Sequence, residues 1–260
     1  VFVYLKVNDD GHPDAAIEKL EEAGHPVVRI VLPEVLNLGQ EFFRWEIATA
    51  VAGSILEINP FNQPDVEASK IVTKELTSAY EETGSLPFEQ PIFEGAGIKL
   101  FTDERNAAEL NDALNGEKTL ENYIGAHLDR IVEGDYFGLL AYVEMNNENQ
   151  DSLQAIRHSI LENYKVATCL GFGPRFLHST GQGYKGGANN GVFLQITADD
   201  IEDLAVPNQK YTFGVVKAAQ ARGDFSVLAE RKRRVLRVHL GSDIRKGLLQ
   251  IGGIIKNRGN

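Results

Sequence analysis

The order of hydrophobic and polar residues at the start of the chain predicts a strand, a helix and a second strand. Residues 1–7 and 27–32 are short stretches rich in valine, leucine and isoleucine, a composition typical of strands. Residues 14–23 place apolar side chains at helical spacing and are followed by Gly24, after a turn predicted at 9–13. Because the connections are short, we expect the two strands to be parallel and joined by a right-handed crossover.

The rest of the chain continues as an alternation of strands and helices. Apolar runs predict further strands at residues 98–101, 136–145, 166–171, 192–197 and 235–240. Amphipathic spacing predicts helices at residues 38–58, 66–80, 106–115, 119–132, 151–164 (capped by Asp151 or Ser152), 213–221 and 225–232. For residues 248–255 a helical turn and an edge strand both stay open. The alternation predicts an α/β fold, with three-layer αβα sandwiches around mainly parallel sheets.

A linker is predicted near the end of the first third of the chain. Residues 78–91 carry glycine, serine and two prolines, which interrupt regular structure. The length of 260 residues allows two modest domains with real cores. We therefore expect one domain at residues 1–85 and a second α/β domain at residues 86–260.

Composition narrows the classes of partner. The formal net charge of −11 argues against nucleic acid or an anionic membrane, because both require clustered lysine and arginine. The single cysteine, Cys169, excludes an internal disulfide and a cysteine-based zinc site, and we expect it to fill the core. No apolar run has the length needed to cross a bilayer, so a cytoplasmic protein is expected.

The most informative stretch is residues 53–70, with the sequence Gly-Ser-Ile-Leu-Glu-Ile-Asn-Pro-Phe-Asn-Gln-Pro-Asp-Val-Glu-Ala-Ser-Lys. Pro60 is predicted to end the preceding helix, because its ring clashes with the turn before it and it has no N–H to donate. Gln63 then lies in the bend, and Lys70 follows about two turns further along the chain. An amide and an ammonium group at this spacing, beside a helix N-terminus, are suited to hold one small anionic ligand.

This stretch resembles the C-terminal signature of the glucose-6-phosphate isomerase family. The signature consists of a glycine, an aliphatic pair, an aromatic residue, an Asn-Gln pair, a Val-Glu pair and a lysine. In this chain the matching residues, in the same order, are Gly53, Ile55-Leu56, Phe61, Asn62-Gln63, Val66-Glu67 and Lys70. Asp65 departs from the pattern, since the family usually has glycine there. Residues 38–46 resemble the helix that leads into the signature. Residues 1–6 and 173–182 resemble the isomerase half of bifunctional transaldolase/glucose-6-phosphate isomerases, which implies a SIS-like subdomain at residues 1–85.

The resemblance implies roles for individual residues of the signature. Lys70 is implied to open the sugar ring and stabilise charge near the ring oxygen, although a lone lysine on a helix is more often a solvated surface residue. Gln63 is implied to contact the substrate phosphate, and a turn or capping role is compatible with this. Glu67 is a candidate for substrate binding or for pairing within its own helix. Glu46 either shapes the site or is a plain surface charge.

A glycine-rich stretch at residues 171–191 is the second candidate site. It follows a predicted strand, at the end where open α/β sheets place ligands, and its glycines would let backbone N–H groups approach an anion. Arg175, Gln182 and Lys185 are candidates for substrate binding, and His178 for the proton shuttle of ring opening. The alternative is a turn that packs against a neighbouring subunit. The remaining histidines are scattered and expected at the surface or in packing: His12, His25, His127, His158 and His239.

Other parts that the resemblance calls for are not found in the sequence. The chain has no Gly-Gly-Arg segment of the family's first signature and no Glu-Ser-Asn-Gly-Lys-like stretch to carry the carbon base. We therefore expect a piece of a longer isomerase that is inactive alone, needs neither cofactor nor metal, and acts on a phosphorylated sugar. The expected partners are the remainder of the isomerase chain and a second copy in a homodimer. The alternatives are a non-catalytic sugar-phosphate-binding module and a purely structural dimerisation half.

Overall fold

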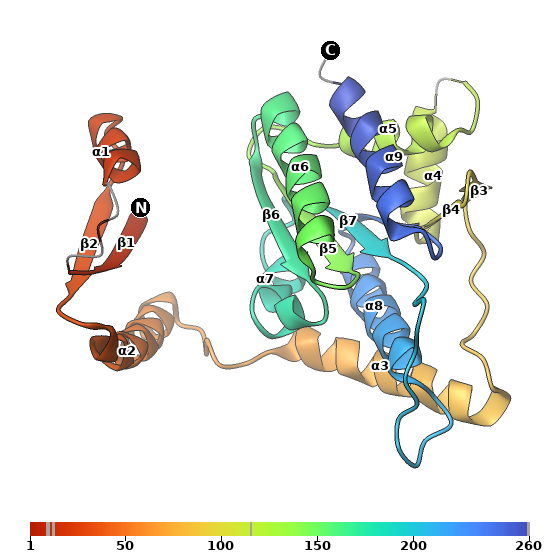
Figure 1. Ribbon diagram of the computed structural model, residues 1–260, viewed down its shortest axis with the longest axis horizontal. Helices are drawn as coiled ribbons and strands as arrows, with labels where there is room; N and C mark the ends of the chain where they lie inside the picture. Colours follow the sequence, from red (N-terminus) through yellow and green to blue (C-terminus); the bar gives the residue numbers. More distant parts are fainter. Residues whose placement is uncertain (9–10, 12–13, 115, 259–260) are drawn as a thin grey trace. The chain divides into compact units, whose positions relative to one another are not determined.

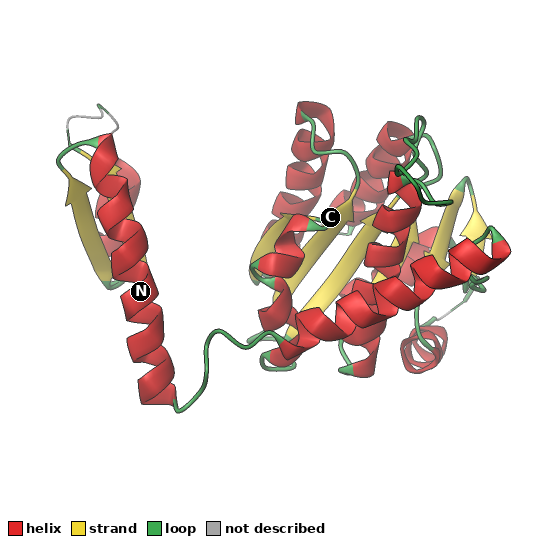
Figure 2. Ribbon diagram, turned by 90° about the horizontal axis from the view of Figure 1, so that it is seen from below, coloured by secondary structure: helices red, strands yellow, loops and turns green. Residues whose placement is uncertain are grey.

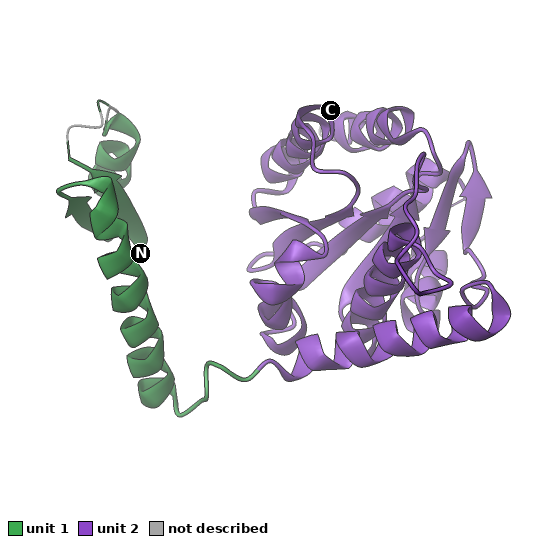
Figure 3. Cartoon of the chain, turned by 60° about the horizontal axis from the view of Figure 1, so that its bottom comes forward, with its two compact units in different colours: residues 1–62 green, residues 63–260 purple. Residues whose placement is uncertain are grey.

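The computed structural model describes residues 1–8, 11, 14–114 and 116–258. These residues form two compact units, Val1–Asn62 and Gln63–Asn260, which are coloured separately in Figure 3. Most of the turn predicted at 9–13 lies outside the described residues, as does His12. None of the helices in the described part is long and apolar enough to cross a membrane.

The first unit contains the predicted strand–helix–strand and one long helix. Strand β1 (Phe2–Val7) and strand β2 (Val27–Leu32) are parallel, with Phe2 opposite Val27, and helix α1 (Ala15–Glu22) connects them. A short 3₁₀ helix (Val35–Asn37) leads into helix α2 (Leu38–Leu56). These elements confirm the predicted strands, helices and strand direction of this region. Among its described residues the unit fully buries only Leu32, Glu41 and Gly53, so it lacks a core of its own.

The end of α2 explains the first glycine of the signature. The helix ends at Glu57, whose φ of 56° is left-handed, and Pro60 folds back onto the last turn. A Cβ atom on Gly53 would lie 2.5 Å from the Pro60 Cδ atom, so only glycine allows this return. The proline thus ends the helix as predicted, and it also fixes the identity of a residue seven positions earlier.

The second unit is a three-layer α/β sandwich around a six-stranded sheet. The strands are β3 (Phe93–Gly95), β4 (Ile98–Phe101), β5 (Tyr136–Tyr142), β6 (Ala167–Phe172), β7 (Gly191–Thr197) and β8 (Arg234–His239). Their order is β3-β4-β8-β7-β5-β6. Strands β5 to β8 are parallel to one another, whereas β4 at this edge pairs antiparallel with both of its neighbours, β8 and β3. The predicted fold class is confirmed; the antiparallel edge was not predicted.

Helices cover both faces of this sheet (Figures 1 and 2). They are α3 (Pro64–Thr83), α4 (Glu104–Ala113), α5 (Leu120–Leu128), α6 (Asn147–Tyr164), α7 (Gly181–Gly186), α8 (Phe213–Glu230) and α9 (Ile244–Asn257). One apolar core joins α4, α5, α6 and α9 to the sheet, and a second joins α7 and α8 to its other face. Helix α3 packs along the outside of α8.

Local predictions differ from the structure at α8 and at the start of α6, and the structure decides between the two alternatives for residues 248–255. The predicted break between residues 221 and 225 does not exist, because α8 runs straight through it. Gly223 lies against α3 there: a Cβ atom would come within 2.7 Å of the Ser69 carbonyl oxygen, so this glycine serves close packing and not a turn. Helix α6 begins earlier than predicted and is capped by Asn146, whose side chain accepts from the Asn149 N–H. Residues 248–255 belong to the longer helix α9.

The compact units also divide the chain differently from the predicted domains. Helix α3 continues to Thr83, through the first part of the predicted linker, before an irregular segment leads to β3. Because α3 packs on α8, it belongs to the same unit as the six-stranded sheet. The signature therefore has its glycine and proline in the first unit and its glutamine and lysine in the second.

Candidate functional site

The start of α3 presents the polar residues of the signature on one exposed side. Gln63, the N-cap residue, and Glu67 and Lys70 are spaced so that they share a helix face, and all three are exposed. The opposite side is buried, with Asp65, Val66 and Ser69 nearly inaccessible. The helix thus separates the residues that hold it in place from those free to meet a ligand.

Lys70 has one ion-pair partner on this face. Its Nζ atom donates to Oε1 of Glu67 at 2.6 Å, and the two side chains stay 54% and 63% exposed. Exposed pairs of this kind contribute about 0.3–0.5 kcal/mol. Exchange of the Glu67 carboxylate for a ligand oxygen would therefore cost little.

The helix N-terminus itself offers few free N–H groups. Pro64 has no N–H, and the Asp65 N–H donates to Oε1 of Gln182 at 3.0 Å. Gln63 makes no side-chain cap hydrogen bond within the described part of the chain, and it lies at the exposed end of the helix. Any anion at this position would be held by side chains more than by the backbone.

Gln182 joins the glycine-rich stretch to the signature. Its Nε2 atom donates to Oδ2 of Asp65 at 2.7 Å, while its Oε1 atom accepts from the Asp65 N–H. Arg231 Nε donates to the other oxygen of the same carboxylate at 2.7 Å. Asp65, which departs from the family pattern, is therefore a buried anchor between α3, α7 and the end of α8.

Lys185 lies in the core. Its Nζ atom is 2.5 Å from Oδ1 of Asp224, and both side chains are almost completely inaccessible. Burial raises the pKa of the Asp224 carboxyl group, and the Lys185 ammonium opposes that rise. The structure thus commits this ammonium to an internal ion pair and does not present it beside Lys70.

Arg175 and His178 are exposed on a short 3₁₀ helix (Arg175–His178) after β6. Arg175 Nη1 contacts the sulfur of Met145 at 3.0 Å. Tyr184 from α7 is buried and contacts Cys169, whose Sγ atom is 3.3 Å from its hydroxyl. The glycine-rich stretch therefore forms a packed 3₁₀ helix and α7, with Cys169 half-buried against them.

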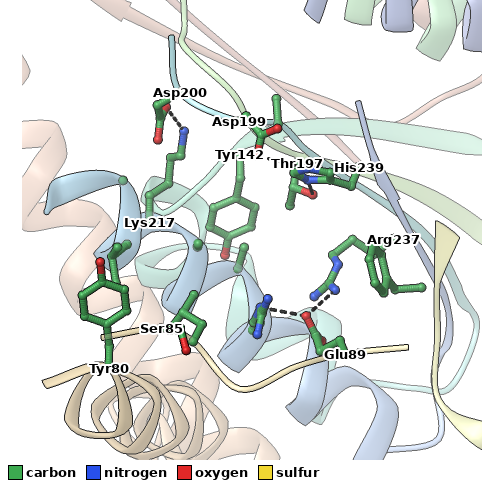
Figure 4. A pocket seen from close by; sticks show the side chains of 18 of the residues that line it. Tyr80, Ser85, Glu89, Tyr142, Thr197, Asp199, Asp200, Lys217, Arg237 and His239 are labelled. Carbon is green, nitrogen blue, oxygen red and sulfur yellow. Dashed lines mark hydrogen bonds and ion pairs between the residues drawn. The ribbon is translucent and has the colours of Figure 1, made fainter. Parts of the chain in front are cut away.

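A cavity of about 560 Å³ lies elsewhere in the second unit, and sequence reasoning missed it. It opens at the carboxyl ends of β5, β7 and β8, where Tyr142, Thr197 and His239 line it, beside the C-terminal part of α3 and the start of α8 (Figure 4). One feature of the sequence does indicate this cavity: residues 195, 197, 237 and 239 are polar and occupy alternate positions of two otherwise apolar strands. His239 had been expected only at the surface or in packing.

The charges around this cavity are mostly paired. Glu89 Oε2 is 2.7 Å from Arg222 Nε and 2.7 Å from Arg237 Nη2, and Lys217 pairs with Asp200. His239 Nε2 is 3.3 Å from Asp199, and its Nδ1 is 3.1 Å from the Thr197 hydroxyl. Burial lowers the pKa of His239, and the Asp199 carboxylate opposes this.

Asp203 completes the acidic side of the cavity. Its carboxylate accepts from the Gly214 N–H at 2.8 Å, at the first turn of α8. The hydrogen bond from Thr212 is the main cause of a lowered Asp203 pKa, and the Gly214 N–H adds to it. The N-terminus of α8 is thereby occupied by the protein's own carboxylate.

Comparison with known proteins finds short similarities to glucose-6-phosphate isomerases. The enzyme of Parabacteroides distasonis is 43% identical over 51 residues, which is 19% of this chain and 11% of that protein. The enzyme of Rubrobacter xylanophilus is 40% identical over 62 residues, 23% of this chain and 14% of that protein. The aligned stretches cover 11% and 14% of the length of these two relatives, which is about an eighth of each.

No family model matches the chain. Among solved structures, a hypothetical protein from Thermus thermophilus aligns with a TM-score of 0.46 and 16% identity, over 60% of this chain and 43% of that one. The relationship that these comparisons support is therefore a partial one, between a short part of this chain and the glucose-6-phosphate isomerases.

Proposed function

We propose that the chain forms part of an aldose–ketose isomerase that interconverts glucose 6-phosphate and fructose 6-phosphate through an enediol. The observation that carries the proposal is the 40–43% identity to glucose-6-phosphate isomerases over 51–62 residues. The start of α3 adds support, because it holds Gln63 and Lys70 together on an exposed side. The bifunctional transaldolase type and a cytoplasmic location belong to the same proposal.

The proposed roles follow from what the reaction needs. Ring opening requires a proton for the ring oxygen, and the enediol carries developing negative charge. The Lys70 ammonium supplies positive charge at that oxygen, once a substrate replaces its exposed partner Glu67. The Gln63 amide donates to the substrate phosphate. Neither step uses a cofactor or a metal ion.

The carbon base is proposed to come from polypeptide outside these 260 residues. The first unit supports such an association, because its apolar side chains have no cover within the unit: Phe42, Phe43, Trp45, Ile47, Val51 and Ile55. A surface of this kind is typical of an interface. The remainder of the isomerase chain is the proposed partner, and a second copy of this chain in a homodimer is the alternative.

A non-catalytic sugar-phosphate-binding module is the second candidate function. It needs only the exposed face of α3 with Gln63 and Lys70, and no carbon base. The two candidates differ in turnover, since a sensor would bind glucose 6-phosphate and never convert it. Fold alone does not separate them.

The test is a coupled assay of fructose 6-phosphate formation. The chain is assayed alone, then mixed with an isomerase polypeptide that carries the family's base-bearing segment but lacks the Gly53–Lys70 signature. We expect turnover only in the mixture. Binding of glucose 6-phosphate without turnover in the mixture would favour the sensor, and turnover by the chain alone would overturn the proposed division of the site.

A further inference from the structure

The face of the sheet that packs against α8 changes from apolar to polar toward the carboxyl ends of its strands. Along β8 the residues on this face are Val235, Arg237 and His239, and their partners on β7 are Phe193, Gln195 and Thr197. Val235 and Phe193 are completely buried in the apolar core. Thr197, Arg237 and His239 line the cavity of about 560 Å³, a size typical of sites for small metabolites.

The cavity also lies where open parallel sheets bind their ligands. Strand β5 is connected to β6 on one side, while β7 and β8 follow on the other, so the chain reverses direction of winding between β5 and β7. Ligands of doubly wound sheets bind outside the carboxyl ends of the strands at this point. Tyr142 of β5 and Thr197 of β7 line the cavity there.

Arg237 is the residue that indicates the chemistry of a ligand. Its side chain is 5% exposed, and its guanidinium carbon lies 4.4 Å from the centroid of the Phe101 ring and 5.4 Å from that of Phe225. Nη2 donates to Glu89 at 2.7 Å. Nη1 is buried, and among the described residues it has no hydrogen-bond partner. A buried donor left unpaired is costly, and a ligand that accepts from it would remove that cost.

The charge balance beside Arg237 is positive. Arg237 and Arg222 share the single carboxylate of Glu89, which leaves one uncompensated positive charge in that cluster. On the other side Asp200 pairs with Lys217, whereas Asp199 and Asp203 keep their negative charges, because the lowered pKa of His239 leaves its ring neutral and the Gly214 N–H is a neutral donor. An anionic group would therefore be attracted to the arginines and kept away from the start of α8.

We propose that this cavity binds a small hydroxylated metabolite through its phosphate or carboxylate group, which Arg237 and Arg222 hold. Guanidinium groups suit both kinds of anion, because their parallel N–H donors match two oxygens. Asp199 and Asp203 also line the cavity, and their carboxylate oxygens are suited to accept hydrogen bonds from ligand hydroxyl groups. The site is separate from the Lys70 face of α3 and does not depend on the proposed isomerase activity.

The test measures binding of inorganic phosphate and of malonate to the full chain by isothermal titration calorimetry. Both probes are titrated into a Gln63→Ala/Lys70→Ala background, which removes the amide and the ammonium group of the α3 face. Tighter binding of phosphate assigns a phosphorylated ligand, and tighter binding of malonate a carboxylate ligand. Absence of binding by both probes up to about 10 mM would overturn the proposal.

Two substitutions at the arginine cluster have opposite expected effects. Arg237→Met removes the buried donor and should weaken binding at least about tenfold, or about 1.4 kcal/mol. Glu89→Gln removes the internal carboxylate that competes for both arginines and should strengthen binding several-fold. Arg245→Gln deletes an exposed arginine of α9 that pairs with Glu148 outside this cavity, and it should leave binding unchanged.

Because the two variants are expected to change the affinity in opposite directions, the test stays decisive even where one of them folds poorly. If Arg237→Met does not fold, Glu89→Gln alone decides, since a general loss of structure cannot strengthen binding. Equal affinity of the parent and the Glu89→Gln variant would overturn the proposal. So would unchanged binding in a folded Arg237→Met variant.

Discussion

Asp65 and Gln182 lie 117 residues apart and exchange two hydrogen bonds, from Gln182 Nε2 to Asp65 Oδ2 at 2.7 Å and from the Asp65 N–H to Gln182 Oε1 at 3.0 Å. The pair fastens the first turn of α3 to α7. The residues proposed to meet the substrate, Gln63 and Lys70, occupy the other side of the same turns. Positioning of the signature therefore depends on the glycine-rich stretch, which was first considered as a ligand site itself.

Gln182→Ala should lower the free energy of unfolding by about 1–3 kcal/mol. The substitution removes the hydrogen-bond partner of the buried Asp65 N–H and one of the donors to the Asp65 carboxylate. Urea denaturation followed by circular dichroism measures this. Gln150→Ala, at an exposed position of α6, is the control and should stay within about 0.5 kcal/mol of the parent. Equal stability of the two variants would contradict the anchoring role.

Lys185→Met should destabilise the protein by about 3–5 kcal/mol, because it leaves the Asp224 carboxylate buried without its counter-charge. The double variant Lys185→Met/Asp224→Asn should recover part of that loss, since the remaining group is neutral. A double-mutant cycle in guanidinium chloride measures the coupling. Additive effects of the two substitutions would contradict a direct pair.

His127 predicts a dependence of stability on pH. It is completely buried on α5 with Nε2 3.0 Å from the Phe193 carbonyl oxygen, and burial lowers its pKa from 6.5 to about 3. The unfolded chain therefore takes up a proton near pH 6.5 that the folded chain refuses until about pH 3. Stability from this group is complete above pH 6.5 and falls by about 1.4 kcal/mol per pH unit below it.

His127→Gln provides the control for that pH dependence. Glutamine keeps a donor for the Phe193 carbonyl but does not titrate. Urea midpoints at pH 5 and pH 7 (chosen on either side of the ordinary histidine pKa of about 6.5) should differ clearly in the parent and much less in the variant. The same pH dependence in both proteins would assign it to other groups.

Gly223→Ala should destabilise the contact between α3 and α8 by about 1–3 kcal/mol, because the new Cβ atom would meet the Ser69 carbonyl oxygen at 2.7 Å. Gly253→Ala is the matched control within helix α9. No atom lies within 4 Å of its Cβ position, so helix propensity should make it stabilising by about 0.5–1 kcal/mol. Thermal unfolding of both variants should shift the midpoint in opposite directions.

Most of the regular elements could be predicted from the sequence, because they have a local cause. Apolar runs identify β5 and β7, and Pro60 identifies the end of α2. The continuous helix α8 could not be predicted in this way. Arg222, Gly223 and Asp224 look like a turn, and only contacts with α3 and Lys185, distant in sequence, make them helical.

The candidate site was predicted only in part, and for a similar reason. The exposed face of α3 follows from helical spacing within one segment, so Gln63, Glu67 and Lys70 could be grouped from the sequence. The glycine-rich surroundings of Lys185 suggest a ligand-binding role, but its ion-pair partner Asp224 lies on another helix, which the local sequence does not reveal. The cavity beside Arg237 depends on the order of strands in the sheet, which no local pattern contains.

Steady-state isomerisation in the complemented mixture tests whether Lys70 acts on a sugar phosphate. Lys70→Met is compared with Lys74→Met, an exposed lysine one turn further along α3. We expect kcat to fall by about 10²–10⁴ for Lys70→Met and to stay near the parent value for Lys74→Met. Equal turnover by the two variants would contradict this role of Lys70.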